Sequence, residues 1–322
     1  TAWQALLARE GIRGETHLDA VYGIHDDDGR LIATGARYRN ILKCIAIDHE
    51  HQGGSLFNTL MSALMNDVHR AGYAACYVYT KASARDAFAW LGFREIAHVE
   101  DKLYFLENAL HGLPQYLAAL RGKYVAGSRI AAIVMNANPF TNGHRYLVEK
   151  AARENDVVHL FVLSEDLSHY PGSVRLALVQ AGIAPLKNVY VHPTGDYIIS
   201  AATFPSYFLR EDDDVTTIQA RLDARIFKEH IAPTLGITKR YVGHEPYSAA
   251  TAIYNNALQQ EFAGTPQLEI VERLRADGEY ISASRVRELI ANGNLEAVRP
   301  LVPPTTFAYL QGGELPESGN PR

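Results

Sequence analysis

Long apolar runs and cysteines are both scarce in this chain of 322 residues. No stretch approaches about 18 consecutive apolar residues, so the sequence predicts no membrane-spanning helix. The two cysteines, Cys44 and Cys76, cannot form a disulfide scaffold, and both lie in apolar stretches. We expect buried free thiols there. The chain does not open with a charged segment followed by an apolar core, so we expect no secretory signal and a cytoplasmic protein.

A strong excess of one charge is also missing. Lys and Arg number 31 and Asp and Glu number 36, which gives a net charge of −5. The chain therefore lacks an overall basic footprint, and we expect neither nucleic acid nor a membrane among its partners. The apolar content of 47%, the 24 glycines and the 14 prolines are near globular averages, which excludes a disordered or collagen-like chain. At about 150 residues per domain, the length predicts two domains.

The first third of the chain has the pattern of an α+β domain. Strands are predicted over residues 17–24, 31–34, 40–48 and 74–80, with helices over residues 56–70 and 84–91. The run Asp26-Asp27-Asp28-Gly29 predicts a hairpin turn. We do not expect calcium there, because an EF-hand loop needs alternating ligands and a distant Glu.

Glycines and a proline mark a boundary near residues 111–128, around a short helix expected at residues 115–120. We assign residues 1–111 to a first domain, residues 112–127 to a linker helix, and residues 128–322 to a second domain.

Strands and helices alternate in the second domain. The run at residues 129–135 is apolar throughout, as in a parallel strand buried on both faces. A helix at 143–154 and a strand at 157–163 complete a βαβ unit. Further helices are expected over residues 217–230, 248–262, 284–291 and 295–301, with strands near 189–191 and 240–242. This alternation predicts an α/β fold with a doubly wound parallel sheet.

The segment 135–144 reads Met-Asn-Ala-Asn-Pro-Phe-Thr-Asn-Gly-His and joins the first strand of this domain to its helix. Ligands of open α/β sheets bind at such a strand end, and a helix N-terminus attracts phosphate. Thr141 can cap the helix, Gly143 allows close approach of the backbone, and His144 lies in the first turn. The alternative is an ordinary capped helix with a histidine facing solvent.

A second segment, 281–287, reads Ile-Ser-Ala-Ser-Arg-Val-Arg and also opens a helix. Ser282 and Ser284 offer hydroxyls, and Arg287 offers a fixed planar charge suited to phosphate. By itself this segment could be no more than a helix capped by serine.

The two segments resemble the His-x-Gly-His signature, in its Thr variant, and the Ile-Ser-Ser-Thr-x-x-Arg signature of the nucleotidyltransferase superfamily. The second departs from its pattern at Ala283. The resemblance implies attack on the α-phosphate of ATP, with release of pyrophosphate and with Mg²⁺ carried by the triphosphate rather than by a protein site. It implies catalytic roles for His144, Thr141 and Arg287, and ATP-binding roles for Asn136, Ala137, Asn138, Pro139, Phe140, Gly143, Ile281, Ser282 and Ser284.

Three weaker features lie between the signatures. Residues 241–246 suit an adenine or ribose site, with Gly243 and Glu245 as candidates. Residues 197–208 are rich in aromatic rings and hydroxyls and could form either core or an acyl pocket lined by Tyr197, Ser200, Thr203, Phe204 and Tyr207. Arg175 could reach a phosphate or be solvated. The acidic residues 211–214 are expected to form a solvated loop rather than a cation site.

In its order of motifs, nearly the whole chain resembles the citrate lyase ligase family. This resemblance implies that acetate is activated by ATP as acetyl-AMP and then transferred to the thiol of a CoA-like group on the acyl carrier subunit of citrate lyase. An alternative is another adenylyltransferase, acting on a phosphopantetheine or a mononucleotide, which predicts basic residues on the acceptor side. A non-catalytic nucleotide or CoA sensor is a further alternative.

The first domain resembles GNAT acetyltransferases. Their Gln/Arg-x-x-Gly-x-Gly/Ala loop corresponds to residues 52–57, which put Ser55 and Phe57 at the two small positions. A phenylalanine would crowd a phosphate there, so we do not expect independent acetyl-CoA chemistry. We interpret the loop, with Gln52, Gly53, Gly54 and Ser55, as a docking site for the CoA-like arm. An active acetyltransferase with an ATP-binding appendage would instead turn over acetyl-CoA without ATP.

Overall fold

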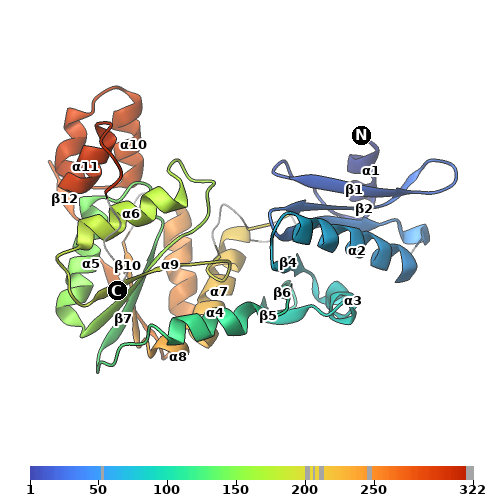
Figure 1. Ribbon diagram of the computed structural model, residues 1–322, viewed down its shortest axis with the longest axis horizontal. Coiled ribbons are helices and arrows are strands. Elements are labelled where there is room, and N and C mark those ends of the chain that lie inside the picture. The colour runs from blue at the N-terminus through green and yellow to red at the C-terminus, as the bar shows by residue number, and fades with distance from the viewer. Residues whose placement is uncertain (52–53, 200–203, 206, 210–213, 245–248, 317–322) are drawn as a thin grey trace. The chain divides into compact units, whose positions relative to one another are not determined.

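The computed structural model describes residues 1–51, 54–199, 204–205, 207–209, 214–244 and 249–316. The chain forms two compact units (Figure 1). The first contains Thr1–Tyr116 and Pro205–Ile218, and the second contains Leu117–Phe204 and Gln219–Arg322. The segment at 205–218, which the sequence assigned to the second domain, thus groups with the first unit. Among the described residues, no helix combines the length and apolar character needed to cross a bilayer.

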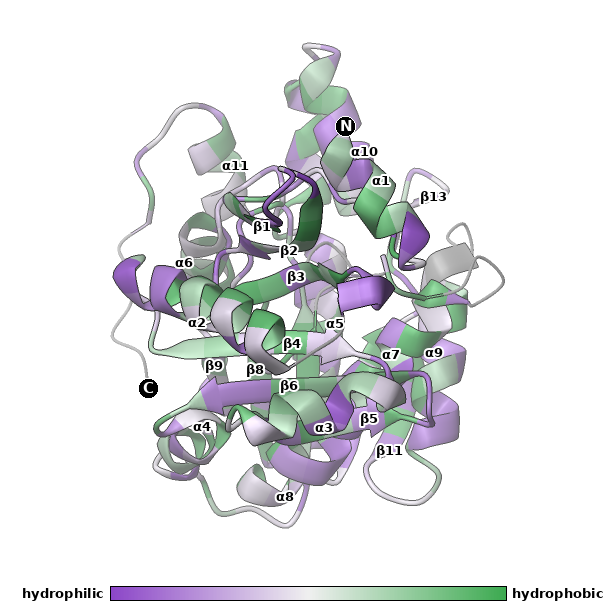
Figure 2. Ribbon diagram, turned by 90° about the vertical axis from the view of Figure 1, so that its right-hand side faces the viewer, coloured by the Kyte–Doolittle hydropathy of each residue, from purple (hydrophilic) through white to green (hydrophobic). Residues whose placement is uncertain are grey.

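The first unit is a six-stranded sheet with helices. Its elements are α1 (Ala2–Arg9), β1 (Ala20–His25), β2 (Leu31–Tyr38), β3 (Ile41–Ile47), α2 (Gly54–Arg70), β4 (Ala75–Thr80), α3 (Arg85–Trp90), β5 (Arg94–Val99), β6 (Leu103–Ala109) and the start of α4 (Gly112–Arg121). The strand order is β1-β2-β3-β4-β6-β5. Figure 2 shows β3 as largely hydrophobic, with α2 beside it. Helix α2 buries Leu60, Met61, Leu64 and Val68 against the sheet, because these positions share one helical face.

The parallel pair β3–β4 is short. It pairs Ile41 with Tyr77 and Leu42 with Val78, whereas β3 continues to Ile47. The β2–β3 register also shifts between Thr34 and Ala36, and Cys44 has a φ of 50°. A bulge of this kind bends a strand and takes backbone groups out of the ladder.

The second unit is a parallel sheet covered on both faces. Its main elements are β7 (Ile130–Met135), α5 (Asn142–Glu154), β8 (Val157–Val162), α6 (Gly172–Ile183), β9 (Val189–Pro193), α7 (Val215–Ile226), α8 (Ala232–Leu235), β10 (Lys239–Gly243), α9 (Ala249–Glu261), β11 (Gln267–Val271), β12 (Arg275–Ala276), β13 (Glu279–Tyr280), α10 (Ala283–Ala291) and α11 (Pro304–Leu310). Helices α5 and α6 pack on one face of the sheet, and α7 to α9 lie on the other (Figure 1).

The five strands of this sheet have the order β11-β10-β7-β8-β9, and every pair is parallel. The chain moves outward from β7 in one direction through β8 and β9, and then in the other through β10 and β11. A crevice opens where the direction reverses, beyond the carboxyl ends of the strands. The predicted doubly wound fold is therefore confirmed, and the segment 135–144 begins at this crevice.

Candidate active site

His144 is held at the start of α5 by Thr141. The Thr141 hydroxyl accepts a hydrogen bond from the His144 backbone N–H at 3.3 Å, which caps the helix. In return, the Thr141 backbone N–H donates to His144 Nδ1 at 3.1 Å. Burial, together with the charge of Arg273, lowers the pKa of His144 to about 4. The ring is therefore neutral at pH 7, and since Nδ1 accepts, its proton lies on Nε2.

Phe140 anchors the loop from behind. Its ring is fully buried and stacks on His144, with centroids 5.9 Å apart. The ring fits because α6 has glycine at residue 182, where a Cβ atom would lie 2.5 Å from Phe140 Cε1. Phe140 thus supports His144 from within the core.

Arg175 is neither solvated nor placed to bind phosphate. Its side chain is fully buried in α6. The guanidinium donates to the backbone oxygen of Asn136 at 2.8 Å and to that of Tyr170 at 2.9 Å, and also to the Glu165 carbonyl. It therefore fastens the loop that follows β7 to the loop that precedes α6.

The second signature lies against the first. Ser282 caps α10 by accepting the Arg285 backbone N–H at 3.2 Å. A Cβ atom at Gly143 would lie 3.2 Å from the Ile281 backbone oxygen, which is tighter than an ordinary contact, so glycine favours the close approach of the two segments. The Arg287 guanidinium donates to the Asn138 carbonyl and to Ser284 Oγ. Arg287 therefore joins the two segments directly.

The N-termini of α5 and α10 open into one pocket of about 430 Å³, formed entirely within the second unit. It is lined by Val134, Met135, Asn136, Thr141, Gly143, His144, Tyr146, Leu147, Leu163, Ile198, Ile199, Gln219, Val242, Gly243, Thr251, Tyr254, Asn255, Val271, Glu272, Arg273, Ile281, Ser282, Ala283 and Ser284. Two helix starts with capping hydroxyls form a site suited to a polyanion.

The two ends of the pocket differ in chemistry. Residues after β10 and β11 are polar and include Arg273, which the sequence analysis missed. Arg273 comes just after β11, at the same edge of the sheet as residues 136–144, and this position could have identified it as a candidate site residue. The residues that follow β8 and β9, namely Leu163, Ile198 and Ile199, are apolar. The pocket thus has a polar end and an apolar end.

The structure brings most of the expected ATP-binding residues together. Asn136, Thr141, Gly143, His144, Gly243, Ile281, Ser282 and Ser284 line the pocket. Ala137 and Phe140 are buried behind it, Pro139 and Asn138 complete the loop, and Arg287 braces it. Glu245, Ser200, Thr203, Gln52 and Gly53 lie outside the described residues.

The remaining acyl-pocket candidates belong to different units. Tyr207 belongs to the first unit, where the Arg13 backbone N–H donates to its carbonyl at 2.9 Å. Tyr197 is buried and Phe204 is half-buried, while the lining residues from this stretch are Ile198 and Ile199.

The loop expected to hold a CoA-like arm is partly described. Gly54 and Ser55 are exposed at the start of α2. Phe57 packs edge-on against Phe88, with ring centroids 5.4 Å apart, so its ring belongs to the core of the first unit.

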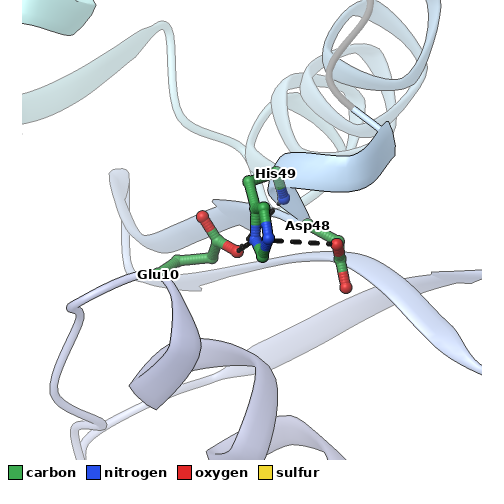
Figure 3. Close-up of side chains that lie close together, drawn as sticks. All are labelled: Glu10, Asp48 and His49. Atoms are coloured by element: carbon green, nitrogen blue, oxygen red, sulfur yellow. Dashed lines mark hydrogen bonds and ion pairs between the residues drawn. The ribbon is translucent and has the colours of Figure 1, made fainter.

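A cluster of acidic and imidazole groups lies elsewhere in the first unit (Figure 3). His49 Nδ1 is 3.2 Å from Glu10 Oε1 and 3.9 Å from Asp48 Oδ1. The buried Asp48 carboxylate also pairs with Arg9 at 3.0 Å and with Arg30 at 2.8 Å. Two guanidinium groups already balance this carboxylate, so we interpret the cluster as an ion-pair network between α1 and the end of β3.

Comparisons with known proteins point to one family. Residues 130–310 match the family described as "Citrate lyase ligase C-terminal domain". A citrate (pro-3S)-lyase ligase of Escherichia coli is 41% identical over 290 residues, covering 88% of this chain and 82% of that protein. The enzyme of the same name from Haemophilus influenzae is 34% identical, covering 96% of this chain and 94% of that one.

One solved structure, Thermotoga maritima TmcAL bound with alpha-thio ATP, is 14% identical, with a TM-score of 0.36, covering 57% of this chain and 55% of that chain. The assignment rests instead on the sequence relatives, which span most of both chains. The chain is therefore an enzyme of the citrate lyase ligase family.

Proposed function

We propose that this ligase activates acetate with ATP and transfers the acetyl group to the thiol of a CoA-like group on the acyl carrier subunit of citrate lyase. The names of its relatives support citrate lyase as the target. The observation that carries the chemistry is the pocket in which the starts of α5 and α10 meet, with His144, Ser282 and Ser284 in its lining. We place the reaction in the cytoplasm, where ATP is present and where Cys44 and Cys76 remain free thiols.

In this proposal the α-phosphate lies at the start of α5. Neutral His144 donates from Nε2 to a phosphate oxygen as negative charge grows, and the helix end adds its amides. The pyrophosphate lies at the start of α10, near Ser282, Ser284 and the charge of Arg273. Arg287 positions the loop through the Asn138 carbonyl. Mg²⁺ would enter bound to phosphate oxygens, because Glu272 is the one carboxylate among the described lining residues.

The chemistry consists of two balanced steps. An acetate oxygen attacks the α-phosphorus in line, which forms the acetyl-AMP anhydride and breaks the bond to the pyrophosphate. The carrier thiolate then attacks the acetyl carbon, which forms a thioester and releases AMP. Since acetate and thiol supply both nucleophiles, the protein contributes positioning and charge stabilisation.

The acceptor end of the pocket favours a small carboxylic acid over a phosphate-bearing acceptor. A phosphopantetheine or a mononucleotide needs cations at its phosphate. Among the described lining residues Arg273 is the one arginine or lysine, and it lies at the polar end, whereas Leu163, Ile198 and Ile199 form the other end. We therefore prefer acetate to the alternative acceptors.

The test is pyrophosphate release from ATP, measured with acetate present and with acetate omitted, and then with the thiol carrier added. We expect release to require acetate, and hydroxylamine to trap the intermediate as acetohydroxamate. Release without an acid, or a dinucleotide product, would refute the proposal and favour another adenylyltransferase.

We further propose that residues 1–111 form an acetyltransferase-like domain that docks the CoA-like arm, with residues 112–127 as a linker helix and residues 128–322 as the catalytic domain. The exposed start of α2 at Gly54 and Ser55 supports this role. Calorimetric titration of the full chain with the carrier, with and without its prosthetic group, tests it. Equal affinity for both forms would show that the arm is not bound there.

A further inference from the structure

The apolar end of the pocket has a rigid wall. Ile198 and Ile199 follow β9, line the pocket and are only 6% and 5% exposed. The backbone N–H of Ile199 donates to Asp223 Oδ1 at 3.0 Å, and its carbonyl accepts Gln219 Nε2 at 2.7 Å. Both backbone polar groups of Ile199 are therefore held by side chains of α7, and Gln219 and Asp223 are themselves buried.

The anchor behind the wall is also fixed. The second carboxylate oxygen of Asp223 accepts the Tyr254 hydroxyl at 2.5 Å, and Arg240 Nη2 donates to that hydroxyl at 3.0 Å. The buried Arg240 guanidinium lies over the rings of Phe227 and Phe262. Ile199 is thus tied through Asp223 to α9 and β10. A wall held at this many points has little freedom to retreat from a larger ligand.

The order of the strands places this wall on the acceptor side. In an in-line displacement, the attacking oxygen approaches opposite the leaving group. The proposed pyrophosphate site, α10 with Arg273, follows the edge strand β11. Leu163 follows β8, and the loop that carries Ile198 and Ile199 follows β9, so these residues reach the pocket from the strands on the other side of β7. An acid that attacks from there would direct its alkyl group at the isoleucines.

We propose that Ile199, fixed by Gln219 and Asp223, is the residue that limits the acyl group to that of a short, unbranched carboxylic acid. This inference rests on the function proposed above, since it assumes that a carboxylate attacks ATP in this pocket. The branched side chain occupies the space that the third and fourth carbons of a longer acid would need. Acetate fits, whereas butyrate meets a wall that cannot move.

Ile199→Ala tests the inference. Pyrophosphate release is measured for wild type and variant with acetate, propionate and butyrate, and kcat/KM values are compared. One methylene in an apolar pocket changes kcat/KM by about 10-fold or more. We therefore expect the butyrate-to-acetate ratio to rise at least about tenfold, while acetate is still turned over. Ile237→Ala, the same change at a buried residue outside the lining, should leave the ratio unchanged.

The outcomes separate the two proposals. If wild-type release does not depend on acetate, the proposed function fails and the inference fails with it. If wild type uses acetate and Ile199→Ala keeps the wild-type ratio, only the inference is overturned. Should Ile199→Ala fail to fold, the same assay is carried out with Ile199→Val, which removes a single carbon. An increased preference for propionate over acetate supports the role of Ile199 in limiting the acyl group, and an unchanged preference overturns it.

Discussion

At the residue scale, the proposed chemistry depends most on the proton that His144 carries on Nε2. Thr141 uses its backbone N–H to occupy Nδ1 of His144, and burial keeps the ring neutral by lowering its pKa to about 4. A histidine that donates from Nε2 at every pH near neutrality is suited to stabilise growing charge on phosphate, and its activity should not depend on becoming protonated.

Replacing His144 should slow chemistry without unfolding the chain. We expect His144→Ala to lower acetate-dependent pyrophosphate release by about 10²–10³, because one preorganised donor is lost. His144→Gln, whose amide nitrogen can lie near the position of Nε2, should retain more activity than His144→Asn, whose amide lies near Nδ1. The exposed His17→Ala serves as control. Near-normal release by His144→Ala would contradict the role.

At the element scale, the ends of α5 and α10 could be predicted from sequence because capping and phosphate chemistry are local. Helix α6 could not, since it is buried almost all round and has no amphipathic period. The burial of Arg175 was equally hidden, because its partners are backbone carbonyls of two loops. The edge strand β5 mixes polar and apolar residues without a clear alternation, and the edge strand β11 is only five residues long.

Helix α7 holds Ile199 through Gln219 and Asp223, so the anchor can be changed while the Ile199 side chain is kept. Gln219→Ala leaves the Ile199 carbonyl without its donor and should raise the relative use of butyrate, with acetate activity retained. The matched control is the exposed Gln259→Ala on α9. A purely structural role would reduce activity with all acids equally, so an unchanged acid preference in Gln219→Ala would count against the anchor.

Strands β8 and β9 carry a buried histidine pair, with His159 Nδ1 2.9 Å from His192 Nε2. Burial lowers the pKa of His159 to about 4 and, together with the charge of its neighbour, that of His192 to about 3. The unfolded chain therefore takes up protons near pH 6.5, before the folded chain does. The contribution of the pair to stability is fully present above pH 6.5 and is lost as pH falls toward 4.

Thermal unfolding at pH 7 and pH 5 checks this dependence. We expect the midpoint to fall less between these pH values in the double variant His159→Leu and His192→Leu than in wild type. Val158→Ala, on the same strand, should lower the midpoint at both pH values and leave the difference unchanged. The idea fails if the double variant keeps the full acid sensitivity of wild type.

At the scale of the whole molecule, the sequence predicted the two folds and their order but not the membership of residues 205–218. That segment groups with the first unit through contacts between residues that are about 160 to 200 positions apart in the chain. The Arg13 side chain reaches the Leu209 carbonyl at 3.3 Å, and the Cys44 backbone hydrogen-bonds to the Tyr207 hydroxyl. Such pairings depend on the folded geometry and leave no local pattern.

The stability of the first unit should depend on this distant segment. Tyr207 is 6% exposed, and burial raises the pKa of its hydroxyl. Tyr207→Phe removes the hydroxyl that meets the Cys44 backbone and should lower the free energy of unfolding by about 1 kcal/mol. Tyr124→Phe, at a residue that is 50% exposed, should have little effect. Denaturant titration measures both, and equal stabilities of the two variants would refute the contribution of this contact.

The inclusion of Pro205–Ile218 in the first unit also bears on how relatives can be recombined. A chimera that joins residues 1–116 of this chain to the remainder of a homologous ligase would take its Tyr207 segment from the other parent. The contact most exposed to a mismatch is then the one between Cys44 and the imported segment, and not the peptide bond at which the two pieces are joined. If residues 205–218 are transferred together with residues 1–116, Cys44 and Tyr207 both come from the same parent and their contact is kept.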